Sequence, residues 1–154
     1  MIFNPSREDV RRFFCDAWRK QNAGELLTPL EGLALKWVAA HPEYHALLDD
    51  PERALAEDFT VERGVTNPFL HLAMHLALEE QLSIDQPPGI RGAFAQLTAH
   101  AGAEHDAAHE AMECLGEIVW RTQRSALPPD TAALNAAYLE CLRRRLSGRR
   151  SGPG

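Results

Sequence analysis

Apolar residues recur every three to four positions along most of this chain, as they do in α-helices. The alternating runs of β-branched residues that are typical of strands are absent. Alanine, leucine, glutamate and arginine, which favour helices, are the dominant residues. Capping signals at Ser6, Thr28 and Asn67 mark three helix starts, two of them followed directly by a proline. The pattern predicts helices over residues 7–20, 29–41, 43–49, 52–57, 68–82, 89–101, 103–124 and 131–146.

The segments between these helices carry loop chemistry. Residues 58–66 surround a glycine, 83–89 contain two prolines and a glycine, and 126–130 contain two further prolines. We therefore expect an all-α fold: a compact helical bundle of four to five main helices packed side by side. Hemerythrin, ferritin-like and DinB-like bundles are its analogues, by analogy only. A single domain over 1–146 and a disordered basic tail over 147–154 complete the prediction.

Composition narrows the class of protein. The chain has 154 residues, of which 45% are hydrophobic and 25% charged, and this balance excludes wholesale disorder and collagen-like structure. No apolar run approaches the roughly 20 residues that cross a bilayer, and the N-terminus lacks the regions of a secretory signal. We expect a soluble, cytoplasmic protein. Its three cysteines, Cys15, Cys114 and Cys141, form no C-x-x-C motif and are expected to be reduced thiols.

Charge is distributed unevenly. The net charge is −6, although five arginines lie among residues 143–150. An acidic body disfavours nucleic-acid binding, which needs a basic face. We expect no nucleic-acid or membrane partner, whereas a small-molecule ligand and a homodimer stay open.

Six of the seven histidines share one spacing, in which two histidines and a carboxylate follow one another at intervals of four residues. On an α-helix these positions form one stripe, so two imidazoles can bind a single metal ion and the carboxylate can bind or bridge a second. The three copies are His41, His45 and Asp49; His71, His75 and Glu79; and His105, His109 and Glu113.

Each copy also has a structural interpretation. Buried histidines can be satisfied by ordinary hydrogen bonds, and those at the edge of a helix face can be polar boundary residues. The first copy is the weakest because Pro42 interrupts the helix, so His41 and Asp49 rank below His45. Glu31 is explained as a capping residue. The predicted metal ligands are His71, His75, Glu79, His105, His109, Glu113 and His45.

If helices 68–82, 89–101 and 103–124 alternate in direction, the two strong copies lie on parallel helices and face one shared site. Imidazole with carboxylate suits iron, zinc or manganese, and two ions fit this donor set. Iron would support oxygen or redox chemistry or sensing, and zinc a hydrolase or transferase. Catalytic residues cannot be assigned, although Glu79, Glu113 or Glu117 could act as a general base. The alternative is a non-catalytic helical adaptor with buried structural histidines.

One string of this sequence, from Glu80 to Arg91, is specific enough to suggest a family. Further segments that share the resemblance are 3–7, 12–14, 41–45, 66–72, 74–76, 104–106 and 112–117. On these residues the sequence as a whole, over about 2–145, resembles a bacterial family, the domain of unknown function 1841 family. The resemblance implies a bacterial cytosolic protein and no particular activity.

Overall fold

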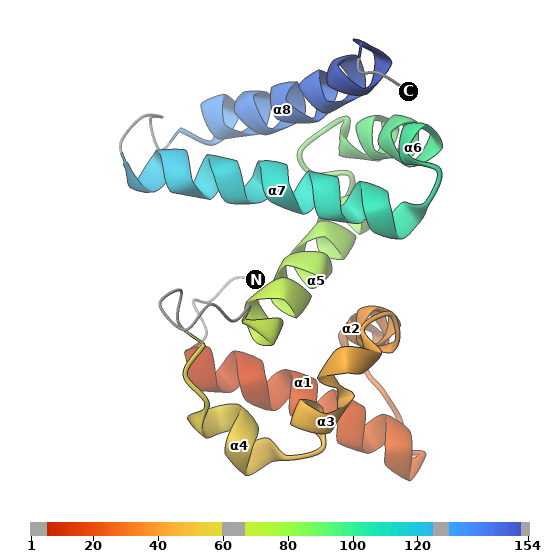
Figure 1. The fold of residues 1–154 in the computed structure, drawn as a ribbon, viewed down its shortest axis with the longest axis vertical. Coiled ribbons are helices and arrows are strands. Elements are labelled where there is room, and N and C mark those ends of the chain that lie inside the picture. The colour runs from red at the N-terminus through yellow and green to blue at the C-terminus, as the bar shows by residue number, and fades with distance from the viewer. Residues whose placement is uncertain (1–5, 60–66, 125–129, 152–154) are drawn as a thin grey trace. The chain divides into compact units, whose positions relative to one another are not determined.

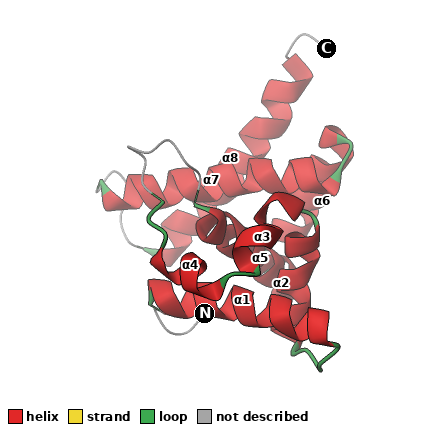
Figure 2. Ribbon diagram, turned by 60° about the horizontal axis from the view of Figure 1, so that its bottom comes forward, coloured by secondary structure: helices red, strands yellow, loops and turns green. Residues whose placement is uncertain are grey.

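The computed structural model describes residues 6–59, 67–124 and 130–151, and every regular element within these ranges is a helix (Figures 1 and 2). The prediction of an all-α protein is confirmed. None of the described helices is long and apolar enough to span a membrane. The elements are α1 (Arg7–Ala23), α2 (Pro29–Ala39), the 3-10 helix η1 (Pro42–Tyr44), α3 (His45–Leu48), α4 (Pro51–Ala56), α5 (Pro68–Ile84), α6 (Ile90–Ala101), α7 (Glu104–Gln123) and α8 (Thr131–Ser151).

Helix starts follow the predicted caps. The Ser6 hydroxyl accepts the backbone N–H of Asp9 at 3.0 Å, and the Thr28 hydroxyl accepts that of Glu31 at 3.1 Å. In both cases the acidic side chain returns the bond to the cap residue, which completes a capping box. Asn67 caps α5 through its side-chain oxygen, which accepts the N–H of Phe69 at 3.0 Å.

The ends of α1, α2, α5 and α8 differ from the prediction by two to five residues. Helix α2 stops at Ala39, and His41 has φ −127° and ψ 68°, because a residue before proline is pushed out of the helical region. Helix α8 continues to Ser151, five residues beyond the predicted end at 146. Residues 147–151 are therefore helical, whereas 152–154 lie outside the described residues.

The chain divides into two compact units, Met1–Ala77 and Leu78–Gly154, and each is described here by itself. In the first unit α1 packs against α2, α3 and α4, with Phe14, Ala17 and Val38 fully buried. In the second unit α6, α7 and α8 pack against one another, and Leu97, Ala111 and Leu142 are fully buried. Helix α5 begins in the first unit and ends in the second.

A buried arginine that the sequence analysis missed, Arg11, binds backbone carbonyls at the end of α4. Arg11 on α1 is 1% exposed, and its guanidinium donates to the carbonyls of Ala54 at 2.8 Å and Glu57 at 2.7 Å. The last turn of a helix leaves carbonyls without intrahelical partners, and these bonds satisfy two such groups at the end of α4. They also join α1 to α4.

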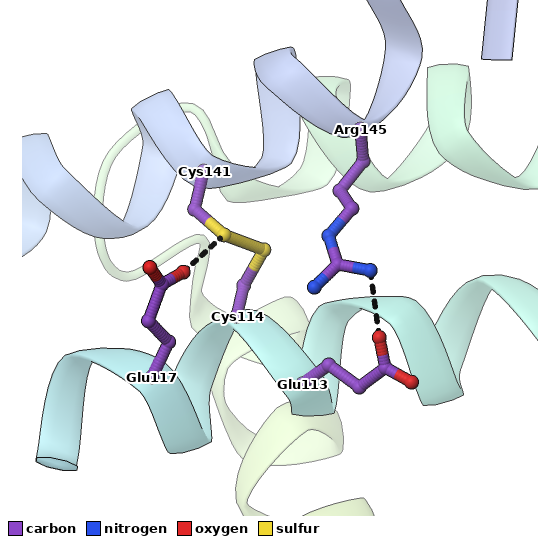
Figure 3. The surroundings of a disulfide bond; sticks show 5 residues. All are labelled: Glu113, Cys114, Glu117, Cys141 and Arg145. Atoms are coloured by element: carbon purple, nitrogen blue, oxygen red, sulfur yellow. Dashed lines mark hydrogen bonds and ion pairs between the residues drawn. A yellow bond between two sulfur atoms is a disulfide. The ribbon is translucent and has the colours of Figure 1, made fainter. Parts of the chain in front are cut away.

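The expectation of three reduced thiols is wrong for two of the cysteines. Cys114 on α7 and Cys141 on α8 form a disulfide, with their Cα atoms 5.8 Å apart (Figure 3). This spacing is usual for disulfides, and it arises because α7 and α8 lie side by side (Figure 1). Cys15 is free and buried, and burial, with a contribution from Asp16, raises the pKa of its thiol to about 11.

Candidate metal centre

Three imidazole rings of the first unit meet at nearly equal distances. His41 follows the end of α2, and His71 and His75 lie on the first two turns of α5. The ring centroids of His41 and His71 are 4.8 Å apart, those of His41 and His75 are 4.9 Å apart, and those of His71 and His75 are 4.8 Å apart. We call these three residues the histidine triad.

The triad is sheltered from solvent. His75 is fully buried and His41 is 4% exposed, while His71 is half-buried. The indole of Trp37 stacks on the ring of His75, with centroids 4.1 Å apart and planes inclined by 13°. Tyr44 stacks in parallel on His41 at 5.3 Å. Burial, with a contribution from Glu43, raises the pKa of Tyr44 above its ordinary value, so its hydroxyl stays protonated at neutral pH.

The hydrogen bonds of His41 fix which of its nitrogens carries the proton. Its Nδ1 lies 2.7 Å from the carbonyl oxygen of Trp37, and because a carbonyl only accepts, Nδ1 must donate. In the neutral ring Nε2 is then left with a lone pair. That atom lies 3.1 Å from Nε2 of His71. The fold therefore presents a basic nitrogen of a buried ring to a second imidazole.

The separation of 3.1 Å between these nitrogens fits two arrangements. In the first, Nε2–H of His71 donates to Nε2 of His41. In the second, both nitrogens bind one ion, since two ligands at about 2.0–2.1 Å from a metal lie roughly 2.9–3.4 Å apart for angles between 90° and tetrahedral. Metal binding requires that Nε2 of His71 give up its proton, either by a change of tautomer that places the proton on Nδ1 or by release to solvent.

A second pair of imidazoles lies in the other unit. His105 and His109 occupy the first two turns of α7, their ring centroids are 4.4 Å apart, and both are half-buried. Each offers one ring nitrogen as a ligand atom, and these two atoms lie within 4.8 Å of each other. The helical spacing of four residues thus brings the pair together as predicted.

The first copy of the spacing does not form a stripe. His45 lies away from the triad, with Nε2 donating to the carbonyl of Val38 at 2.8 Å and its ring stacked on Trp18 at 4.3 Å. Asp49 accepts the indole N–H of Trp18 at 2.7 Å. The non-helical backbone at His41 explains this arrangement, because only a continuous helix places residues four apart on one face.

The predicted carboxylates occupy different environments. Glu79 lies on α5 one turn after His75 and is half-buried. Glu113 on α7 is exposed and pairs with Arg145 of α8 at 2.6 Å (Figure 3). Glu117, also on α7, contacts Cys141. Glu31 performs the capping function expected of it.

His45 was expected to be a better ligand candidate than His41, but His41 is the residue that the structure places beside His71 and His75, whereas His45 contacts Trp18 and the Val38 carbonyl. A signal was present, because a histidine directly before a proline sits at a helix boundary and is turned away from the helix that follows. The proline after His41 therefore indicates that His41, His45 and Asp49 do not lie on one helix face. It does not indicate which residues the His41 ring contacts.

Fold and site together define an all-α protein with clustered, partly buried histidines. The chain belongs to the family described as a domain of unknown function (DUF1841), whose model matches residues 6–144. No curated protein and no solved structure gives a significant match. The chemistry of the histidines therefore carries the functional argument.

Proposed function

We propose that the protein binds a divalent transition metal through the histidine triad. The observation that carries this proposal is the state of His41: a buried imidazole whose Nδ1–H is donated to the Trp37 carbonyl, with Nε2 directed at a neighbouring imidazole. Histidines that bind metals usually donate their other ring N–H to a carbonyl or carboxylate, which fixes the tautomer and orients the ligand atom. The bond to Trp37 has this form.

The second pair extends the proposal. Three imidazoles leave at least one position of a four-coordinate ion open, and further positions of a six-coordinate ion. We propose that His105 and His109 supply ligands to a second ion, with Glu79 as a candidate carboxylate, whereas Glu113 would have to leave its ion pair with Arg145 to take part. His45 is left out, because its Nε2 is engaged by the Val38 carbonyl.

Imidazole donors favour iron or zinc over magnesium or calcium. With iron, an open position supports oxygen or redox chemistry or sensing. With zinc, a bound water of lowered pKa supports hydrolysis or group transfer. A cytoplasmic location is part of the proposal, which leaves open whether the protein is an enzyme.

The test is elemental analysis of protein purified without a histidine tag, after equilibration with iron or zinc. Wild-type protein should retain at least one ion per chain. The variants His41→Ala and His71→Ala should lose most of it, because each removes one of three ligands. His100→Ala is the matched control, since His100 is exposed on α6 and outside both clusters. Far-UV circular dichroism verifies that each variant is folded.

Two results would contradict the proposal. One is wild-type protein that binds no more metal than a sample of His41→Ala. The other is equal metal loss in His100→Ala. His109→Ala then tests the second ion: a loss of about half the metal indicates two ions, and an unchanged metal content indicates binding by the triad alone. If no variant changes metal content, the helical adaptor with hydrogen-bonded histidines is the better description.

A further inference from the structure

A carboxylate, that of Glu117, contacts the disulfide between Cys114 and Cys141. Both cysteines lie in the interface of α7 and α8, with Cys114 fully buried and Cys141 4% exposed. An oxygen of the Glu117 carboxylate lies 3.2 Å from Sγ of Cys141 (Figure 3). Glu117 itself is exposed.

We propose that Cys114 and Cys141 form a redox-active site that exchanges two electrons with a low-molecular-weight thiol, and that Glu117 favours its reduced state. This inference is independent of the proposed metal site, because none of its three residues belongs to the histidine clusters.

The Glu117 carboxylate interacts differently with the oxidised and the reduced pair. A disulfide sulfur carries no proton, so the oxygen of Glu117 accepts nothing from the oxidised pair and faces sulfur lone pairs instead. After reduction, the S–H of Cys141 can donate to the same oxygen, and a hydrogen bond to a charged acceptor is stronger than one between neutral groups. The carboxylate therefore stabilises the dithiol relative to the disulfide. Readily reduced disulfides are the regulatory or catalytic ones, whereas structural disulfides resist reduction.

Contacts other than the S–S bond also hold α8 in place. Arg145 of α8 pairs with Glu113 of α7 at 2.6 Å, and the hydroxyl of Tyr138 donates to Gln81 at 2.9 Å. Leu142, next to Cys141, is fully buried. These contacts hold α8 against the unit when the S–S bond is broken. The two thiols then stay close enough to re-form the bond, as a reversible couple requires.

The reduction can be written as two thiol exchanges. A thiolate of the small molecule attacks Sγ of Cys141, which is the less buried cysteine; the S–S bond breaks, and Cys114 leaves and takes up the proton that the attacking thiol released. A second small thiol attacks the small-molecule sulfur of the mixed disulfide, and Cys141 leaves as a thiol that takes up its proton. Two small thiols are oxidised to one small-molecule disulfide, and the protein gains two electrons and two protons. In the reverse direction, the proton of Cys141 passes through Glu117 to the thiolate that leaves the small-molecule disulfide.

The proposed cytoplasmic location also favours a redox-active disulfide over a structural one. In a reducing cytoplasm, disulfides that form are usually transient and catalytic or redox-sensing. A pair placed within bonding distance beside a carboxylate fits that use. The remaining cysteine, Cys15, lies in the other unit, and its pKa of about 11 makes its thiol a poor competitor for exchange.

The test equilibrates the full chain with mixtures of reduced and oxidised glutathione. Free thiols are trapped by alkylation in denaturant, and peptide mapping by mass spectrometry gives the reduced fraction of Cys114 and Cys141. We expect a reversible transition for the wild type within the range of millimolar glutathione mixtures. In Glu117→Gln the ratio of reduced to oxidised protein at a given mixture should fall about fivefold, because a charged acceptor becomes neutral.

Glu140→Gln is the matched control. It removes a carboxylate next to Cys141 whose nearest charged partner is Arg143 at 3.9 Å, and it should leave the ratio unchanged. Circular dichroism of the reduced protein should retain the helical signal. Thiols that never pair in oxidised glutathione would overturn the proposal, as would a disulfide that stays intact in excess reduced glutathione. An equal shift in both variants would remove the role of Glu117.

Discussion

Glu31 is a carboxylate that joins two helices of the first unit. Its Oε1 accepts the backbone N–H of Thr28 at 2.9 Å, and its Oε2 lies 3.0 Å from the ammonium of Lys20 on α1. The Thr28 N–H and the Lys20 hydrogen bond hold the pKa of Glu31 below its ordinary value. The charged form is therefore stabilised by folding.

This lowered pKa predicts a direction for pH dependence. A carboxylate whose pKa is depressed in the folded state contributes stability above its unfolded pKa, about 4.3, and loses that contribution as pH falls through the folded value. Glu31→Gln should therefore be less stable than the wild type at pH 7, and the difference should shrink below about pH 4. Urea unfolding at pH 7, 5 and 3 measures this.

Glu25→Gln is the control for that experiment, because Glu25 pairs with Arg19 at an exposed position. Exposed ion pairs contribute little, so this variant should follow the wild type at each pH. A difference between Glu31→Gln and the wild type that grows on acidification would contradict the assigned role of the charge.

Single residues also show how far sequence reasoning reaches. His71 and His75 were predicted as neighbours from helical spacing alone, and the structure brings their rings together. His41 could not be predicted as the third member, because its position depends on the path of the chain after α2. Long-range packing decides that path, and no local pattern encodes it.

Among the elements, α5 bears most directly on the site, because its first turns carry two members of the triad. Asn67 accepts the N–H groups of Phe69 at 3.0 Å and Leu70 at 3.2 Å and so fixes the start of the helix. His71 also donates its backbone N–H to the carbonyl of Asn67. The cap residue Asn67 and His71 are thus one hydrogen-bonded turn apart.

We expect Asn67→Ala to lower the free energy of unfolding by about 1 kcal/mol, the usual effect of losing an N-cap. It should also weaken metal retention, because the ring of His71 is carried by the frayed turn. Asn67→Asp keeps the cap and should preserve both properties. The measurements are thermal melting and metal content. If Asn67→Ala and Asn67→Asp had the same melting temperature and the same metal content, the cap would not support the proposed metal site.

Helix starts were predictable because capping is local: the hydroxyl or amide lies within three residues of the groups it satisfies. The pairing of Cys114 with Cys141 was not. It depends on the register of α7 against α8 across 27 residues of chain, and spacing in the sequence carries no information about that register. The same reasoning applies to the Arg145–Glu113 pair.

At the scale of the whole molecule, metal binding should appear as a change in stability. An ion that binds only the folded chain adds to the free energy of unfolding. At pH 7.5 a chelator should therefore lower the melting temperature, and adding back iron or zinc should restore it. Three identical melting curves would contradict the proposed metal site.

Protons should compete with the ion, because histidine binds metal only as neutral imidazole and its reference pKa is about 6.5. Metal should be released as pH falls from about 7 toward 5, with a steep dependence if several imidazoles take part. Elemental analysis after dialysis at each pH measures the release. Retention of the full metal content at pH 5 would indicate ligands other than histidine.

The arginine-rich end should be dispensable for folding. The buried residues of α8 that the structure describes are Tyr138, Cys141 and Leu142, and none lies beyond them. Deleting residues 147–154 should leave the melting temperature and metal content unchanged, although α8 loses its last turn. A large decrease in either would show that this end of the helix packs on the rest of the chain.

The stacking of Trp37 on His75 should make the fluorescence of Trp37 sensitive to the state of the His75 ring. An excited indole in face-to-face contact with an imidazole is quenched when that ring becomes cationic or binds an ion with unpaired electrons, and these rings are 4.1 Å apart. Trp18 stacks on His45 at 4.3 Å and provides a second emitter away from the triad. A Trp37→Phe variant should therefore lose the part of the emission that responds to iron, whereas a Trp18→Phe variant should keep it.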